Sequence, residues 1–313
     1  MMRDASRRVD WSDELKYIPL GEREGWYVSI GGEARPFYER YRNEDWGGEP
    51  QDLSGYLLQR FLLHADFHFG EQLRFFGQLQ SGIAAGRRGG ARSSDKDLLD
   101  VLQAFVDVKW NLKHERSLTL RAGRQELNYG SQRLISIREA TNVRRAFDGA
   151  KLMLRAGGGH VDGFIVKPVE NDPGFFDDAP ISSQTFWGIY AVRPLPRLLP
   201  IGNLDLYYLG LDRRSARFDQ GSARETRHTL GTRLSGERRD WDYNAELVYQ
   251  FGAFGRGDIG AWGVGFEGGY TLRRVRFSPR FGFKANATSG DPDPNDPDLG
   301  TFHPLFARGG YFG

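Results

Sequence analysis

The sequence predicts an all-β protein, a transmembrane antiparallel up-and-down β-barrel of the kind found in bacterial outer membranes. First, apolar and polar residues alternate over segments of about 9 to 13 residues. Second, short and long connections follow one another along the chain, as periplasmic turns and outer loops do in such barrels. Third, the 41 glycines and the aromatic content of 13% favour β-structure over helix.

The first strand begins at Trp26, where Val28 and Ile30 face one way and Ser29 the other. The second is clearer, because Phe61 and its apolar neighbours alternate with polar residues. Further strands in the first half of the chain are predicted near 57–69, 73–80, 102–111, 118–125, 146–156 and 160–168.

The second half continues the same pattern to its last strand. Strands are predicted near 184–193, 203–212, 241–251, 262–272 and 274–284. In the last of these, Val275, Phe277, Phe281 and Phe283 oppose Arg274, Arg276, Arg280 and Lys284, so one face carries rings and the other cations. The apolar faces require lipid as a partner.

About thirteen strands are predicted in all. Their long connections, 41–54, 83–97, 127–145, 169–182, 213–224 and 286 onward, with the shorter 253–259, are expected to be extracellular. Bacterial barrels have an even strand number, so the odd number predicts a chain truncated at its C-terminus and about 16 to 18 strands in the complete protein. Residues 1–25 are predicted as a periplasmic N-terminal segment and 26–313 as the barrel.

Several classes of function find no support in the sequence. The 43 basic and 41 acidic residues nearly balance, which does not suggest a nucleic-acid partner. The absence of cysteine excludes disulfides and thiolate metal sites. No apolar stretch reaches the ~18 residues of a membrane helix. Neither a phosphate-binding loop nor a nucleophile elbow occurs, so no enzyme is predicted.

The basic residues are mostly arginine. Only seven are lysine, which leaves 36 arginines. A guanidinium group meets a planar carboxylate with two parallel hydrogen bonds, so this excess favours an anionic cargo. A genome that prefers arginine codons would produce the same excess.

Several stretches resemble the alginate-export family of outer-membrane porins. They are Gly55 to Arg60, His64-Ala65-Asp66, Gly123 to Leu127, Tyr129-Gly130-Ser131, Arg133-Leu134, Asn142 to Arg145 and Phe147-Asp148-Gly149. The resemblance is specific over about residues 10–192. It implies a monomeric channel in which an Arg-rich constriction passes an alginate-like polyuronate, supplied by periplasmic export machinery.

The sequence supplies the charges that such a pore requires. The predicted pore and anion-binding cations are Arg60, Arg74, Lys109, Arg121, Arg124, Arg133, Arg138, Arg144, Arg145, Arg276, Arg280 and Lys284. The predicted lumen counter-charges are Asp66, Asp107, Asp148, Glu246 and Glu267. In the alternative interpretation, these groups only neutralise one another across neighbouring strands.

The connection 127–145 carries several of these arginines. It is expected either to fold inward and narrow the pore or to remain an ordinary solvated outer loop. Successive strand residues point to opposite faces, so either Arg144 or Arg145 is expected to serve the wall or a carboxylate such as Asp148.

No metal site or other cofactor is predicted. His64, Asp66 and His68 share one strand face, but the outer two are ~13 Å apart, which favours a polar lumen row. The Asp291–Asp298 loop offers carboxylates for Ca²⁺ but lacks the glycine and terminal glutamate of an EF-hand loop.

The leading hypothesis is an outer-membrane channel for an anionic polysaccharide or related organic anion. The alternatives are an uptake porin for small nutrients, a barrel hydrolase and a soluble carbohydrate-binding β protein.

Overall fold

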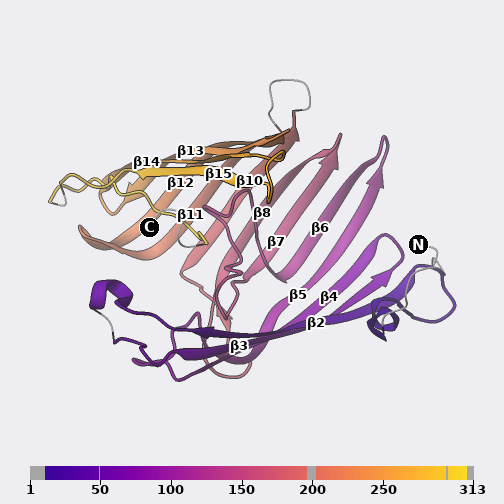
Figure 1. Ribbon diagram of the computed structural model, residues 1–313. Helices are drawn as coiled ribbons and strands as arrows, with labels where there is room; N and C mark the ends of the chain where they lie inside the picture. The colour runs from indigo at the N-terminus through magenta and orange to yellow at the C-terminus, as the bar shows by residue number, and fades with distance from the viewer. Residues whose placement is uncertain (1–10, 49, 196–201, 294, 309–313) are drawn as a thin grey trace.

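The computed structural model describes residues 11–308 apart from 49, 196–201 and 294. It contains one antiparallel sheet of 15 strands, in which neighbours in the chain are neighbours in space (Figure 1). Two strands, β1 (Ile18–Pro19) and β9 (Ala179–Pro180), have two residues each. The long strands are β2 (Trp26–Glu39), β3 (Tyr56–Phe69), β4 (Leu73–Ala85), β5 (Asp97–Leu112), β6 (Arg116–Gln125), β7 (Phe147–Ala156), β8 (Gly159–Glu170), β10 (Gln184–Pro194), β11 (Asn203–Phe218), β12 (Gly221–Arg238), β13 (Trp241–Phe254), β14 (Gly257–Thr271) and β15 (Arg280–Thr288).

The all-β prediction and the predicted number of long strands are confirmed. Two short 3-10 segments, η1 (Trp11–Lys16) and η2 (Glu44–Gly47), are the helical elements of the described residues. No helix in this part of the chain is long and apolar enough to cross a membrane.

The predicted long connection over 213–224 is wrong. β11 continues to Phe218 and β12 starts at Gly221, so a two-residue turn joins them. The register shifts between Arg213 and Ala216, which is a bulge, and pairing then resumes with Ala216 opposite Ala223. Polar residues in these strand ends were therefore mistaken for a loop. The 253–259 connection is likewise a two-residue turn between Phe254 and Gly257.

The last predicted strand begins too early. β15 starts at Arg280, and residues 272–279 form the connection from β14. Phe277 and Ser278 have φ values of 68° and 43°, a left-handed backbone that no strand can contain. Phe281 and Phe283 lie in β15 as expected, whereas Val275 and Phe277 lie in the connection.

The two faces of the sheet differ sharply in exposure. In β3, Phe61 and Leu63 are 44% and 57% exposed, whereas Arg60 and Leu62 are 1% and 6% exposed. Large apolar side chains lie on the outer face of most long strands, including Ile165, Ile189, Leu206, Leu230, Leu247 and Trp262. A soluble protein does not expose so wide an apolar band, which rules against the soluble carbohydrate-binding alternative. Lipid covers this face.

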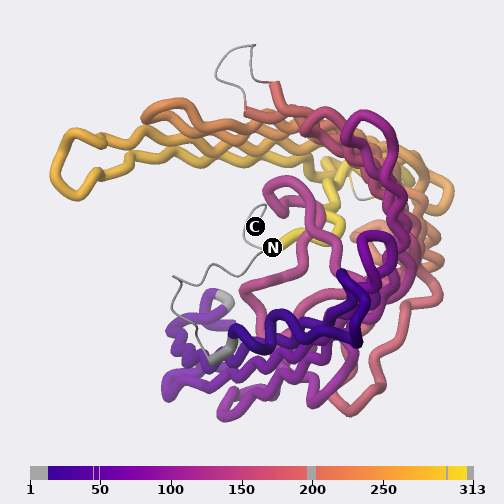
Figure 2. The backbone as a smooth tube through the Cα atoms, turned by 90° about the vertical axis from the view of Figure 1, so that its right-hand side faces the viewer, coloured from indigo at the N-terminus to yellow at the C-terminus, as the bar shows by residue number. Residues whose placement is uncertain are grey.

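The sheet curls around an interior that two chain segments enter (Figure 2). Residues 126–146 connect β6 and β7, and residues 289–308 follow β15. Phe306 links them, because its amide donates to Leu134 O at 2.8 Å and its carbonyl accepts from Ser136 N at 3.0 Å. Their apolar side chains form a core with the inner faces of β7, β8, β10, β11 and β13. In the described residues β15 pairs with β14 alone, so the curl is not closed.

Candidate functional site

Residues 126–146, called the constriction segment below, cross the interior from one wall to the other. Glu139 contacts Arg60 of β3, and Arg133 contacts Glu246 of β13. These two strands are far apart in the sheet order, so the segment spans the space between them. The sequence left open whether this connection folds inward or remains a solvated outer loop. In the structure it folds inward (Figure 2).

Arg60 holds one side of the constriction segment. Its side chain is 1% exposed and lies between two carboxylates, with Nη2 at 2.7 Å from Glu33 Oε1 and 2.6 Å from Glu139 Oε1. Its Nη1 donates to the carbonyls of Glu139 and Thr141 at 2.9 and 3.1 Å. Arg35 donates to the same stretch of backbone, at 3.0 Å from Glu139 O and 2.8 Å from Thr141 O. Two wall arginines therefore bind the exposed carbonyls of this turn.

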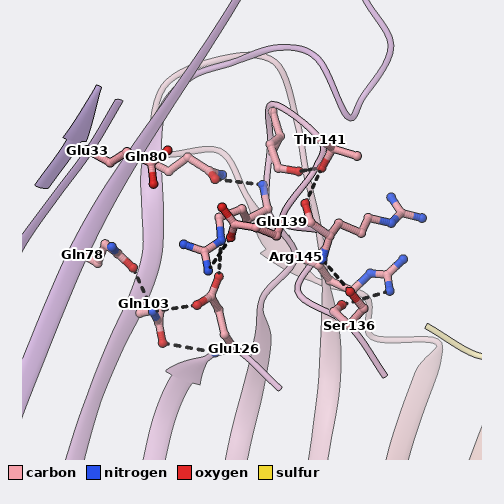
Figure 3. A network of polar contacts seen from close by, with 12 residues as sticks. Glu33, Gln78, Gln80, Gln103, Glu126, Ser136, Glu139, Thr141 and Arg145 are labelled. Atoms are coloured by element: carbon pink, nitrogen blue, oxygen red, sulfur yellow. Dashed lines mark hydrogen bonds and ion pairs between the residues drawn. The ribbon is translucent and has the colours of Figure 1, made fainter. Parts of the chain in front are cut away.

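Arg144 links two acids within the constriction segment itself, Glu126 and Glu139, both of which are labelled in Figure 3. Its Nε lies 2.9 Å from Glu126 Oε1, and its Nη2 lies 3.0 Å from Glu139 Oε2. The pKa of Glu126 is raised to about 7, mainly by burial and also by the charge of Glu139, while Arg144 and Arg60 oppose both effects. Glu126 consequently changes its charge near neutral pH.

Asn142 fixes the segment to the adjacent wall. It is 0% exposed. Its Nδ2 donates to three carbonyls, those of Asp95, Gln59 and Ile83, at 2.8, 3.1 and 3.3 Å. Next to it, Val143 N donates to Ser94 O at 2.9 Å. This part of the segment is therefore anchored as firmly as a strand, without belonging to the sheet.

Arg133 holds the opposite side. Its side chain is 0% exposed and its Nη1 lies 3.0 Å from Glu246 Oε2. The same nitrogen donates to Ser131 Oγ at 3.0 Å and to Asn244 Oδ1 at 3.1 Å. Tyr207 donates to the other oxygen of Glu246 at 2.7 Å. Arg133 and Glu246 both lie in the interior, where each neutralises the other.

Arg138 and Arg145 differ from the other arginines of the segment. Among the described residues, no carboxylate lies within ion-pair distance of either guanidinium group. Arg145 Nη1 instead donates to Phe306 O at 2.5 Å, and its guanidinium carbon lies 5.3 Å from the Phe306 ring centre. Burial, together with the charge of Arg138, lowers the pKa of Arg145 to about 9.

Arg138 also has a left-handed backbone, with φ at 56°. Such a conformation is unfavourable for a residue with a side chain and persists where the surroundings enforce it. Of Arg144 and Arg145, one was expected to serve the wall or a carboxylate such as Asp148. Arg144 does bind carboxylates, but they are Glu126 and Glu139, whereas Asp148 binds Arg124.

A second network lies on the inner faces of β3 to β6. Arg74 Nε lies 2.7 Å from Asp66 Oδ1, and its Nη1 lies 3.3 Å from Asp107 Oδ2. Arg121 approaches the other side of Asp107 at 2.7 Å. The predicted row of His64, Asp66 and His68 is polar as expected, since His68 Nε2 lies 3.1 Å from Asp66 Oδ1.

Two predicted cations and one predicted counter-charge lie elsewhere than expected. Gln125 and Phe147 are buried on the inner face, so alternation turns Arg124 and Asp148 away from the pore, where they pair at 2.8 Å. Arg276 lies in the connection that follows β14, where it is exposed and stacks on Phe277. It is therefore not a lumen residue, because the strand starts four residues later.

The remaining predicted charges lie on inner positions of their strands. Arg280 Nη2 is 2.6 Å from Asp242 Oδ1, a partner that the sequence did not indicate. Lys284 stands opposite Glu267 in the register of β14 and β15. Lys109 shares its face with Asp107.

Sequence reasoning missed several buried ion pairs. Arg227 and Glu225 of β12 are 0% exposed and pair at 2.6 Å. They lie at the end of the connection that was predicted in error, which hid their alternation. Asp205 pairs with Arg233 and accepts from Tyr190 at 2.7 Å. Glu33 and Arg35 fall on the same face as Ser29 in the predicted first strand, but nothing in the sequence indicated their partners.

The structure gives no reason to place Ca²⁺ in the Asp291–Asp298 loop. Asp291, Asp293 and Asp296 each accept a backbone N–H from two residues further on, which is the usual local use of aspartate in turns. The group of acids in the described residues that could hold a metal is a different one, Asp100, Asp177 and Asp178, whose ligand oxygens lie within 4.8 Å of one another.

A family model described as alginate export matches residues 26–313. The crystal structure of Pseudomonas aeruginosa OccK9 (OpdG) is similar, with a TM-score of 0.51 and 12% sequence identity over 85% of this chain and 67% of that chain. At this identity the likeness concerns the fold. Among curated proteins none matches. The family and the fold are those of outer-membrane transport channels rather than enzymes. With nearly its whole length matched, the chain belongs to the alginate-export family.

Proposed function

We propose that this outer-membrane channel passes an anionic polysaccharide, an alginate-like polyuronate, or a related organic anion, along the interior that the constriction segment narrows. Periplasmic export machinery would deliver the polymer, and its carboxylates would move from one guanidinium group to the next. The direction of transport and the identity of the cargo are both part of this proposal.

The observation that carries the proposal is an excess of positive charge at the constriction. We call the charged residues of its Arg60 side the constriction cluster. It has five cations and three acids, namely Arg35, Arg60, Arg138, Arg144 and Arg145 with Glu33, Glu126 and Glu139. Two positive charges therefore remain uncompensated within this set, and Glu170, which lines a cavity together with Arg138 and Arg145, offsets one of them. Glu126 is only partly ionised near pH 7, which increases this excess.

Fixed cations favour anions because a carboxylate that sheds water in a narrow channel needs compensation from the wall. The acids serve a second purpose, since they keep the guanidinium groups from binding the cargo too tightly. Glu139 is 45% exposed although it contacts two arginines, Arg60 and Arg144. An arriving carboxylate can thus take its place without leaving a buried charge unpaired.

Ion selectivity in planar bilayers tests the proposal. The wild-type channel should prefer anions in a salt gradient, and oligouronates should block its current while neutral oligosaccharides of equal length should not. Arg138→Gln with Arg145→Gln should bring the preference close to neutral. Arg224→Gln, which removes a cation that is 68% exposed on β12, is the matched control.

A wild-type channel without anion preference would overturn the proposal. Anion preference without block by oligouronates would instead support the uptake of small anionic nutrients.

A further inference from the structure

A polar cavity of about 210 Å³ lies beside the constriction cluster. Three chain segments form its walls: the connection after β4, the constriction segment, and the end of β8 with the residue that follows it. The side chains that matter here are those of Ser93, Ser94, Arg138, Arg145, Glu170 and Asn171. We propose that this cavity binds one hexuronate unit, with the carboxylate on the two arginines and the ring hydroxyls on the other walls. The inference rests on the proposed function and gives it a defined subsite.

The two arginines supply a place for one negative charge. They are the cations of the constriction segment that have no carboxylate partner among the described residues, and they are close enough for the charge of Arg138 to lower the pKa of Arg145. Arg145 uses Nη1 for the Phe306 carbonyl, and a guanidinium group has five N–H donors, so others remain available. A carboxylate between the two groups would relieve their repulsion.

The other walls supply hydrogen-bonding groups of both kinds. The hydroxyl of Ser93 can donate and accept, and that of Ser94, which donates to Asp95 Oδ1 at 3.3 Å, can accept. Asn171 donates through Nδ2 to Asp178 Oδ2 at 3.1 Å, which leaves its amide oxygen as an acceptor. Glu170 adds a carboxylate acceptor. Vicinal sugar hydroxyls require such acceptors, whereas an inorganic anion would be repelled by Glu170.

The cavity is also held in shape from two sides. Val143 N donates to Ser94 O at 2.9 Å, and Asn142 Nδ2 donates to Asp95 O at 2.8 Å. These bonds fix the arginine wall relative to the serine wall, so the site is formed before any ligand arrives. Pockets for drug-sized ligands measure about 300 to 1,000 Å³, so this smaller one suits a single sugar unit rather than a longer oligomer.

Calorimetric titration of the detergent-purified protein with glucuronate, glucose and phosphate tests the inference. Glucuronate should bind saturably, phosphate more weakly and glucose not at all. Arg138→Gln with Arg145→Gln should weaken glucuronate binding by about tenfold or more, because a charge-assisted hydrogen bond is lost at each arginine. Arg224→Gln should leave it unchanged.

Ser93→Ala with Ser94→Ala separates this inference from the proposed function, because it keeps every charge. It should weaken glucuronate binding several-fold and leave both phosphate binding and the anion preference in bilayers as they are. No saturable glucuronate binding, or equal binding of phosphate and glucuronate, would overturn the hexuronate subsite while the anion channel stands. Loss of anion preference in the wild type would refute the channel proposal regardless of the titrations.

Discussion

Arg60 and Glu139 are joined twice, once through the carboxylate at 2.6 Å and once through the backbone carbonyl at 2.9 Å. One wall side chain thus holds both the charge and the backbone of the constriction segment. The carboxylate bond can be exchanged for a bond to another anion, whereas the carbonyl bonds keep the turn in place. A passing anion can therefore replace the carboxylate of Glu139 at Arg60 while the constriction segment stays in place.

Replacing Arg60 with glutamine should therefore affect the channel more than replacing Glu139. Arg60→Gln removes the carbonyl bonds together with both ion pairs, and we expect a loss of about 1–3 kcal/mol in stability and a larger conductance. Glu139→Gln keeps the backbone bonds and should cost less than half as much. The measurements are the temperature of the heat-dependent gel shift and the single-channel conductance. Equal effects of the two variants would show that the carbonyl bonds do not hold the turn.

Asn142→Ala should loosen the same segment from the neighbouring wall. Its amide donates to three carbonyls in a site that is 0% exposed, and without it these buried acceptors lose a donor. We expect about 1–3 kcal/mol of destabilisation and more frequent current fluctuations in bilayers. Asn111→Ala, which alters an exposed contact with Glu71, is the control. If the current through Asn142→Ala fluctuates no more often than that through the wild type, the hydrogen bonds of Asn142 are not needed to hold the segment.

The alternation of residues predicted the two faces well because each face borders a different medium. Leu57, Phe61 and Leu63 meet lipid and Arg60 meets the interior, so a pattern of period two is enough. The same rule failed at the ends of β11 and β12, where polar residues predominate and the bulge between Arg213 and Ala216 interrupts the alternation. There the pattern does not distinguish a strand from a loop.

The ion pairs could not be predicted in the same way. Arg60 and Glu139 are 79 residues apart, and Arg133 and Glu246 are 113 apart. These partners meet only because the constriction segment crosses the interior, and no local pattern contains that path. The sequence identified several of the arginines that lie inside, although it misplaced Arg124 and Arg276 and missed Arg227. It also did not indicate that Arg138 and Arg145 alone among those of the segment lack an acidic partner in the described chain.

Arg276→Ala should leave ion selectivity unchanged, contrary to what the sequence pattern suggests. Arg276 lies in the exposed connection between β14 and β15, whereas Arg280 lies on an inner position and pairs with Asp242 at 2.6 Å. Arg280→Ala frees the negative charge of Asp242 and should therefore reduce the anion preference. The reversal potential in a salt gradient measures both. An effect of Arg276→Ala equal to that of Arg280→Ala would place the former in the pore after all.

The anion preference should also depend on pH through Glu126. Its pKa is raised from 4.5 to about 7, first by burial and then by the charge of Glu139. Lowering the pH from 8 to 6 protonates it and adds one positive charge to the excess of the constriction cluster, so the anion preference should rise. Glu126→Gln has lost this negative charge at every pH and should show the higher preference throughout.

The free energy of unfolding should also depend on pH through Glu126, and the raised pKa of this group fixes the direction of the change. The folded protein binds the proton of Glu126 more tightly than the unfolded chain, so the contribution is fully present below pH 4.5 and is lost as the pH rises through about 7. The wild type should therefore lose stability relative to Glu126→Gln between these values. Histidines also titrate in this range, but both proteins contain the same histidines. The difference between their free energies of unfolding therefore does not contain the histidine contribution. Glu115→Gln, in the exposed turn before β6, should behave as the wild type. Parallel curves for the wild type and Glu126→Gln would mean that Glu126 stays ionised throughout.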